Sequence, residues 1–417
     1  MLGLIEGVLG SLPVGDSRPV RLMGIINLSR ESFYKGSVAG PGEALSLARR
    51  MQEEGADAVD LGAVSTAPGS PFVSEDLERE RLFPALKEVL EGLDGLDIAV
   101  SVDTQRAAIA EEALSLGAGC INDVSGLSDP AMPASIANHG GSLIIMATAR
   151  RPGDLLFMDQ IIPLLGEKVR AAQQAGVDPS RISVDPGIGK WVPEKAPLHD
   201  LAILDGLPRL RVLGRPVVAA VSRKSFIGEV LAQPDPFQRL EGTLAATAIA
   251  VHLGAHIVRT HDVAASRNTI KMASAIRGRL SCSRDEEMEV EVLDGLGFSQ
   301  DLGEVLRRTG VDELGFPALC KKGSFRILAA HNLSSMEALI VKQEMLSRGG
   351  DAAIPRLALR CDPHPQEVLI LGTAHQIAGL VKNLKGQPFR LSQLAGLIQE
   401  ALQMEESPER YRVGRRP

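Results

Sequence analysis

Aromatic residues are scarce in this sequence of 417 residues, and an excess of positive charge is lacking. Aromatic side chains make up 3% of the chain, with 1 tryptophan, so a nucleic-acid surface built on stacked aromatic rings is not expected. The formal net charge is −7, whereas binding to a phosphate backbone needs a dense basic face. These two shortages predict that no nucleic acid is a partner.

Paired cysteines and long apolar runs are also missing. There are 4 cysteines and no CxxC pair: Cys120, Cys282, Cys320 and Cys361. Scattered cysteines are typical of reduced thiols in a cytosolic protein. The opening residues 1–12 contain Glu6 and lack a basic leader, so we interpret them as a short amphipathic helix before Pro13 and not as a signal peptide or a membrane span. We therefore expect a cytoplasmic protein with no membrane partner.

Apolar runs of strand length are abundant, and they alternate with helix-period segments. The length favours two domains, or one large barrel with an appendage. Eight such runs lie at 20–28, 58–65, 97–103, 120–124, 143–148, 182–187, 216–222 and 256–262. Several of the intervening helical segments, such as 42–55 and 106–117, end in a glycine that fits a helix C-cap. This pattern predicts a (β/α)₈ TIM barrel, with a doubly wound open sheet as the alternative that periodicity leaves open.

Polar residues follow seven of the eight predicted strands, at the end of a barrel where active sites lie. They are Asn27, Ser65-Thr66, Asp103-Thr104, Asn122-Asp123, Asp185, Ser222-Arg223-Lys224, and Arg259 with His261. The fifth strand ends in Met146-Ala147 and is the exception. Each residue taken singly could be a helix cap or a turn residue, but a whole rim of them indicates a site.

The rim residues divide by charge into two groups. Asp103, Asn122 and Asp185 offer hydrogen-bond acceptors and an amide, and Lys224 offers a donor. This set suits the edge of a heterocycle that presents an amino group, a ring N–H and a carbonyl.

The second group is a separate corner that suits an anion. It combines Arg259 and His261 with Asn27 on the adjacent first strand. Guanidinium binds phosphate oxygens in a fork, and Asn27 could add a neutral oxygen ligand to Mg²⁺. We therefore expect a flat polar heterocycle carrying a phosphate or diphosphate as substrate.

A set of motifs in fixed order resembles one enzyme family. These motifs are MGIINLSRESF (23–33), VDLGAVSTAPG (59–69), SVDT (101–104), INDVSG (121–126), DPGIG (185–189), SRKSFIG (222–228) and RTHDV (259–263). Together, over residues 20–277, they resemble dihydropteroate synthase, a pterin-binding TIM-barrel transferase of folate biosynthesis. The resemblance implies condensation of 6-hydroxymethyl-7,8-dihydropterin diphosphate with 4-aminobenzoate or a related arylamine, with release of diphosphate.

The resemblance also implies a role for each matching residue. Asp103, Asn122, Asp185 and Lys224 would bind the pterin. Asn27 with Mg²⁺, Arg259 and His261 would bind the diphosphate. Thr66 and Ser222 would lie near the departing group or the incoming amine. The expected catalytic residues are Lys224, Arg259 and His261.

The sequence departs from the family pattern around the amine acceptor. In the first loop Glu31 and Lys35 replace aspartates, and in the second loop Ala67 replaces the expected arginine. Lys190, followed by Trp191, replaces a phenylalanine, and Ala147 replaces a histidine. These changes predict an altered arylamine or weak synthase activity. Compensation for the absent arginine by Lys35 or Arg30 is the alternative that the sequence leaves open.

A second domain follows the barrel. The predicted organisation is a barrel over 1–280, an acidic linker over 281–295, and a small α/β domain over 296–417. Its stretch KQEMLSRGGDAA (342–353) resembles an auxiliary domain that precedes the barrel in some bacterial dihydropteroate synthases. A lid, a dimer contact and a pterin-delivery module are all open roles. Its polar residues could line a ligand site or simply be caps and solvated faces: His331, Asn332, Lys342, Glu344 and Asp351.

Two rival functions are weighed against the synthase. A methyltetrahydrofolate-type methyltransferase shares the pterin-binding barrel but needs no diphosphate site, so Arg259 and His261 count against it. A non-catalytic pterin-binding protein is favoured by the altered loops alone. The expected partners are small-molecule substrates, and the expected assembly is a homodimer.

Overall fold

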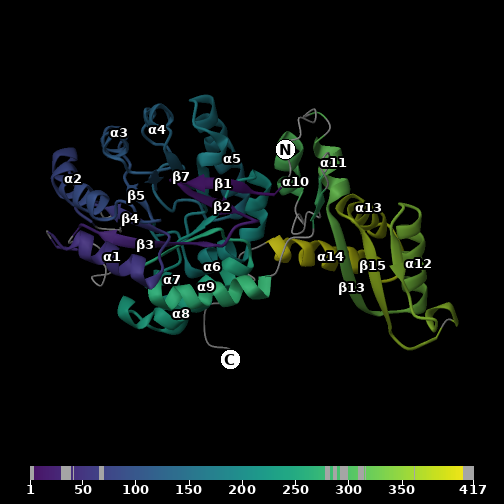
Figure 1. Cartoon of the computed structure of the whole chain (residues 1–417). Coiled ribbons are helices and arrows are strands. Elements are labelled where there is room, and N and C mark those ends of the chain that lie inside the picture. The colour runs from purple at the N-terminus through teal and green to yellow at the C-terminus, as the bar shows by residue number, and fades with distance from the viewer. Residues whose placement is uncertain are drawn as a thin grey trace. The chain divides into compact units, whose positions relative to one another are not determined.

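The chain divides into two compact units, Gly3–Val292 and Leu293–Arg410 (Figure 1). The boundary falls within the segment predicted as a linker, where β11 (Cys282–Arg284) and β12 (Glu289–Glu291) form a short antiparallel pair. The computed structural model describes residues 4–29, 39–40, 42–64, 70–277, 282–284, 289–291, 299–308, 314, 316–360 and 362–406.

The first unit contains a barrel of eight parallel strands, as predicted. In chain order they are β3 (Arg21–Asn27), β4 (Ala58–Gly62), β5 (Ala99–Asp103), β6 (Cys120–Asp123), β7 (Ser142–Met146), β8 (Ile182–Asp185), β9 (Val218–Ala219) and β10 (Ile257–Thr260). Their spatial order is β8-β7-β6-β5-β4-β3-β10-β9. A parallel bridge between Val184 and Val217 joins the two ends of this order, so the sheet closes and the open-sheet alternative is wrong.

Helices follow each barrel strand and cover the sheet on its outer face (Figure 1). They are α1 (Ala44–Glu54), α2 (Glu75–Gly92), α3 (Ala107–Leu116), α4 (Met132–His139), α5 (Met158–Gln174), α6 (Pro197–Asp205), α7 (Ser225–Leu231), α8 (Leu240–His252) and α9 (Val263–Arg277). Gly55 and Gly117 end α1 and α3 in the left-handed region, with φ of 99° and 114°. Glycine takes this conformation without a Cβ penalty, which explains why the helix ends were readable from the sequence.

The N-terminal residues form a β-hairpin, so the predicted amphipathic helix is wrong. Strands β1 (Glu6–Leu9) and β2 (Leu12–Gly15) pair antiparallel, with Gly10 at a φ of 63° in the turn. Leu9, Leu12 and Val14 pack in one buried cluster with the first residues of several barrel strands. The hairpin therefore closes the bottom of the barrel, and this burial outweighs the local helical pattern.

Asp16 anchors the hairpin to the barrel through a buried ionic network. Its carboxylate accepts hydrogen bonds from the Ile5 amide at 2.7 Å, Arg211 Nη1 at 2.7 Å and His256 Nε2 at 3.0 Å. His256 Nδ1 accepts from the Val217 amide at 3.0 Å, so the ring proton lies on Nε2 and is donated to Asp16. Hydrogen bonds to this charged carboxylate, together with the neighbouring His256 and Arg211, outweigh its burial and lower the pKa of Asp16 to about 2.

The second unit is a small α/β domain, as predicted. Its elements are α10 (Ser299–Arg308), α11 (Phe316–Gly323), β13 (Phe325–Leu333), α12 (Ser335–Leu346), β14 (Asp351–Ala353), β15 (Gln366–Thr373), α13 (Ala374–Leu384) and α14 (Leu391–Glu406). The sheet is antiparallel in the order β13-β15-β14. Capping boxes begin α12 at Ser334 and α13 at Thr373. Buried residues such as Val341 and Ile370 form a core of its own.

The polar residues of this domain that could have lined a ligand site mostly pair on its surface. His331 Nδ1 lies 3.1 Å from Glu367 Oε1, and Lys342 Nζ lies 3.0 Å from Asp351 Oδ1. These contacts fit the simpler interpretation of solvated faces. Across the described ranges of both units, no helix is long and apolar enough to cross a membrane.

Candidate active site

The barrel brings those predicted polar residues that the structure describes to one rim. Strand register places Asn27 opposite Gly62, Gly62 opposite Asp103, and Asp103 opposite Asn122, so three of the predicted residues lie at one level. Asp185 ends β8 opposite Met146 of β7. The rim therefore gathers residues that are far apart in the sequence at the carboxyl ends of the strands, where barrel enzymes carry their chemistry.

Arg259 lies at the centre of an ionic network. Its Nε donates to Asp60 Oδ2 at 2.7 Å, and its Nη2 donates to Asp103 Oδ2 at 3.0 Å. Asn122 Nδ2 donates to the same Asp60 oxygen at 3.0 Å. The two corners predicted from the sequence are thus not separate, because Arg259 joins the anion group to Asp103 of the heterocycle group.

Asp60 is a site residue that the sequence reasoning missed. It lies within the apolar strand segment AVDLG, its side chain is fully buried, and it pairs with Arg259. Within the described structure, its Oδ1 has no hydrogen-bond partner, although buried carboxylate oxygens are normally satisfied. A charged residue inside a buried strand was the available signal, because such a residue is rarely kept without a partner.

Burial shifts the pKa values of the carboxyl groups at the rim. Burial, with the nearby negative charges of Asp60, Asp123 and Glu78, raises the pKa of Asp103 to about 7 against the opposing charge of Arg259. Burial also raises the pKa of Asp185, although its Oδ1 accepts from the Gly187 amide at 2.7 Å. Carboxyl groups whose pKa values are raised by burial in this way are typical of functional sites.

Lys224 lies at the start of α7 with its ammonium over the ring of Trp191. Its Nζ is 4.3 Å from the ring centroid, a cation–π distance. Burial lowers the pKa of Lys224 to about 8, opposed by the charge of Asp185. The lysine therefore remains largely protonated at neutral pH and can donate to a carbonyl or an anion.

The loop after Asp185 is held by a second buried pair that the sequence reasoning missed. Lys195 Nζ donates to the Gly187 carbonyl at 2.6 Å and lies 3.3 Å from Asp200 Oδ1. Asp200 in turn accepts from the Gly189 amide at 2.8 Å. Nothing in the local pattern marked Lys195, since lysine is usually exposed. Its contacts fix the backbone that supports Asp185.

His261 and Ser222 meet on adjacent strand ends. Ser222 Oγ lies 2.9 Å from His261 Nδ1 and accepts from the His261 backbone amide at 3.2 Å. In the tautomer that accepts the Ser222 hydroxyl proton at Nδ1, the ring proton lies on Nε2. Burial and the positive charge of Arg259 hold the pKa of His261 well below its usual value, so the ring acts as a neutral donor.

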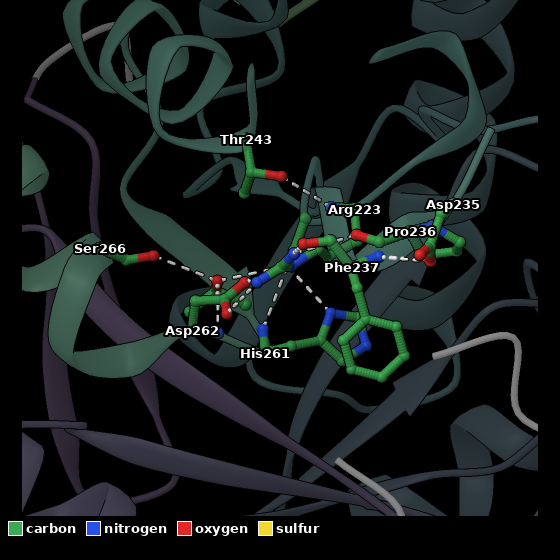
Figure 2. Close-up of polar contacts among 10 residues, drawn as sticks. Arg223, Asp235, Pro236, Phe237, Thr243, His261, Asp262 and Ser266 are labelled. Carbon is green, nitrogen blue, oxygen red and sulfur yellow. Dashed lines mark hydrogen bonds and ion pairs between the residues drawn. The ribbon is translucent and has the colours of Figure 1, made fainter. Parts of the chain in front are cut away.

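Arg223 and Asp262, the residues that follow Ser222 and His261 in the chain, form an ion pair (Figure 2). Arg223 forms two bonds with the Asp262 carboxylate, at 2.8 and 2.6 Å, and its Nη1 donates to the carbonyls of Pro236 and Phe237. Its backbone has a φ of 60°, an uncommon conformation for a residue with a side chain. The amide of Arg223 donates to Thr243 Oγ1 at 2.9 Å. Arg223 is therefore structural, and it fixes the turn that presents Ser222 and Lys224.

Part of the predicted site falls outside the described residues. Thr66, Ala67 and Lys35 belong to this part, so the structure does not place the predicted amine loops. Ala147, at the end of β7, is buried, with 1% exposed. Asn27 ends β3 and its backbone carbonyl accepts from the Ala39 amide at 2.8 Å. Among the described residues, no group of three or more His, Cys, Asp or Glu side chains could hold a metal ion by itself.

Comparison with known proteins places this geometry in a family. A family model described as "pterin binding enzyme" matches residues 23–261. A dihydropteroate synthase from Synechocystis is 37% identical over 279 residues, which are 64% of this chain and 94% of the relative. One from Bacillus subtilis is 39% identical over 61% of this chain and 88% of its own length. A protein from Mycobacterium bovis named inactive dihydropteroate synthase 2 is 36% identical over 64% of this chain and 85% of its own length.

Solved structures give the same result. A dihydropteroate synthase from Coxiella burnetii in complex with pteroic acid is 34% identical, with a TM-score of 0.59, over 66% of this chain and 99% of that chain. One from Thermus thermophilus in complex with 4-aminobenzoate is 37% identical, with a TM-score of 0.55, over 65% of this chain and 99% of that chain. The part of the chain that matches these structures has the length of a TIM barrel, and about a third of the chain lies outside it.

Proposed function

Because this chain belongs to the dihydropteroate synthase family of pterin-binding enzymes, we propose that it condenses 6-hydroxymethyl-7,8-dihydropterin diphosphate with 4-aminobenzoate or a related arylamine. It is a transferase of folate biosynthesis that moves a pterin-methyl group to an amine. The observation that carries the proposal is the Arg259 network, in which one guanidinium joins Asp60 and Asp103 at the rim. A cation held beside a heterocycle-binding carboxyl suits a substrate with both a ring and an anion.

The pterin half of the substrate fits the polar edge formed by Asp103, Asn122 and Asp185. Carboxylates accept from the amino group and ring N–H of a pterin, while an amide serves as donor or acceptor. Lys224 donates to the ring carbonyl. The raised pKa of Asp103 and Asp185 follows from burial, and hydrogen bonds donated by the pterin would stabilise their charged forms.

The reaction breaks the bond between the pterin methylene carbon and the diphosphate oxygen. The bonding electrons leave with the diphosphate, and the amine lone pair forms the new C–N bond; the amine then loses a proton to water or to the released diphosphate. Arg259 and the Nε2–H of His261 donate to the departing oxygens and stabilise the negative charge that develops there. The aromatic amine is already neutral and nucleophilic, so the site needs no strong general base.

We propose Mg²⁺ as the cofactor, bound by Asn27 and the substrate diphosphate. Asn27 contributes a neutral oxygen at the rim, next to the β10 strand that carries Arg259. Mg²⁺ commonly binds through few protein ligands together with phosphate oxygens and water. The described residues hold no cluster that would bind it alone, so the ion should enter with the diphosphate. Calorimetry should detect Mg²⁺ binding only when inorganic diphosphate is present, and the affinity should fall in Asn27→Ala.

A diphosphate-release assay tests the function directly. The purified chain is given the pterin diphosphate, Mg²⁺ and a panel of arylamines that includes 4-aminobenzoate. Release of diphosphate that depends on the amine supports the synthase. Tight pterin binding with no release for any amine would instead identify a non-catalytic pterin-binding protein, and the relative named inactive makes this the outcome to exclude.

We also propose that the chain forms a homodimer through α8 and α9. These helices expose large apolar side chains: Ile249 is 50% exposed, Met272 64% and Ile276 63%. Contiguous exposed apolar residues commonly mark a protein interface. Light scattering should give a dimer for the natural chain and a monomer for Met272→Glu with Ile276→Glu. A natural chain that remains monomeric at high concentration would contradict the proposal.

A further inference from the structure

Two buried side chains at the start of α8 bind the backbone of the turn between Ser222 and Lys224. The residue in the middle of that turn is Arg223, whose amide donates to Thr243 Oγ1 at 2.9 Å (Figure 2). Its carbonyl accepts from Arg239 Nη1 at 3.0 Å. Thr243 is fully buried, and Arg239 is 8% exposed. The turn therefore cannot rotate without breaking a buried hydrogen bond, and a buried group left without its partner is costly.

The guanidinium of Arg239 has a defined place in the fold. Its Nε donates to the Gln233 carbonyl at 2.9 Å, and its Nη2 donates to the Pro234 carbonyl. Gly228 of α7 leaves the space for it, since a Cβ atom there would lie 2.5 Å from Nε. All three nitrogens of the group thus donate to backbone carbonyls, which fixes its orientation. The role of this arginine lies in the backbone that it holds.

The carbonyl that Arg239 binds belongs to the peptide that leads into Lys224. This hydrogen bond sets the plane of that peptide, and with it the direction in which the lysine side chain leaves the backbone. Lys224 is the N-cap residue of α7, with φ of −64° and ψ of 154°. A lysine side chain is a flexible four-carbon stem, so its ammonium can be placed accurately only when the backbone that carries it is fixed.

We propose that Arg239, together with Thr243, is a positioning residue for the ammonium of Lys224. It touches no substrate, and it acts by holding the peptide before Lys224 so that the ammonium reaches the ring carbonyl of the pterin. The inference rests on the proposed function, since it takes a pterin as the ligand of Lys224. A purely structural role, in which Arg239 only stabilises the connection between α7 and α8, is the alternative that the experiments must separate.

A double-mutant cycle on the binding of free hydroxymethylpterin, measured by calorimetry, tests this role. Arg239→Gln should weaken binding by roughly 2- to 12-fold, the value of one hydrogen bond. In a Lys224→Met background the same change should matter by less than about twofold, because the ammonium that it positions is absent. Equal losses in both backgrounds, or an unchanged affinity in Arg239→Gln, would overturn the proposal.

The matched control for this cycle is Arg211→Gln. Arg211 is also largely buried, and it pairs with Asp16 at the bottom of the barrel. The control should lower stability in urea unfolding but change the affinity for hydroxymethylpterin by less than about twofold, because additivity holds for distant sites. A control that weakens binding as much as Arg239→Gln would show that lost stability alone causes the effect, and would overturn the proposal.

Thr243 gives a second pair of variants, which tests the other half of the clamp if Arg239→Gln does not fold. Thr243→Val has a similar shape but no hydroxyl, so the Arg223 amide loses its acceptor, whereas Thr243→Ser keeps it. Thr243→Val should weaken hydroxymethylpterin binding by roughly 2- to 12-fold, and Thr243→Ser should bind as the natural chain does. The same weakening in both variants would show that packing, and not the hydrogen bond, matters, and would contradict the proposal.

A measurement without any ligand separates this inference from the proposed function. The ammonium of Lys224 lies over Trp191, and the chain has 1 tryptophan, so labelling with 5-fluorotryptophan gives one ¹⁹F resonance beside this charge. Lys224→Met should shift the resonance, and Arg239→Gln should shift it in the same direction. A shift in Arg239→Gln without diphosphate release from the natural chain would retain the positioning role and reject the synthase. Release with an unmoved resonance would do the reverse.

Discussion

Replacing Arg259 with lysine or methionine separates two tasks of its guanidinium. One task is to neutralise two carboxyl groups, through Nε to Asp60 at 2.7 Å and Nη2 to Asp103 at 3.0 Å. The other is to bind the substrate diphosphate through Nη1, the terminal nitrogen that these two hydrogen bonds do not use. A hydrogen bond between charged groups contributes about 1.5–3 kcal/mol, which corresponds to roughly 10- to 150-fold in affinity.

Lysine keeps a positive charge beside Asp60 and Asp103 but lacks the planar fork that binds phosphate. Arg259→Lys should therefore fold normally and lose roughly 10- to 150-fold in affinity for the pterin diphosphate, the value of one such bond. Its affinity for the free hydroxymethylpterin should fall by no more than about threefold, because no diphosphate contact is lost. Calorimetry with the two ligands on one protein preparation measures both values.

Methionine removes the charge as well, so it tests the first task. Arg259→Met leaves two buried carboxyl groups without their cation, which typically costs about 3–5 kcal/mol of stability and should appear in urea unfolding. It should also raise the pKa of Asp103 further, since Arg259 now lowers it. The reasoning is refuted if Arg259→Lys weakens both ligands equally, because Nη1 would then not be the group that recognises the diphosphate.

Two further predictions concern charge and pH. Asp16→Asn should lower the free energy of unfolding by about 2 kcal/mol in urea titrations at neutral pH, since the pKa of Asp16 falls from 3.8 to about 2 on folding. The control Glu6→Gln, at an exposed residue of the same hairpin, should cost less than about 1 kcal/mol, and an effect as large as that of Asp16→Asn would contradict this. A carboxyl whose pKa is lowered by folding stabilises the protein above its unfolded pKa. The loss of stability in Asp16→Asn should therefore shrink as pH falls toward 2. The pKa of Asp103, raised to about 7, predicts that kcat/KM for the pterin diphosphate increases as pH rises through about 7, when the carboxylate becomes available to accept. Asp60→Asn removes a negative neighbour and should move this midpoint to lower pH, whereas a flat pH profile would exclude Asp103 from pterin binding.

The barrel was predictable because its signals are local. A strand buried on both faces needs a short continuous apolar run, and a helix that turns back to the sheet commonly ends in a glycine. The clear error in the fold prediction, the N-terminal hairpin, arose where the local pattern permits a helix but burial favours strands. Leu9 and Leu12 gain a buried environment only when the barrel floor exists, and no window of the sequence contains that floor.

The rim residues were predictable in part, for a related reason. Asp103, Asn122 and Asp185 follow apolar runs directly, so their position at a strand end could be read from the chain. Asp60 lies inside its run, and Lys195 follows a loop with no regular pattern. Both were missed because their importance comes from a partner and not from their own neighbours in sequence.

What the sequence by itself determined is the eight alternating strand and helix segments, the polar residues at the strand ends and the family motifs, since each depends on residues within a few positions of one another. Only the tertiary structure decided which charges meet. Arg259 and Asp60 are 199 residues apart, and His256 and Asp16 are 240 apart. Barrel closure brings such residues within hydrogen-bond distance, and burial then sets their pKa values and pairs them. For the same reason, the ring of Trp191 and the ammonium of Lys224 became one feature only when their two loops were placed side by side.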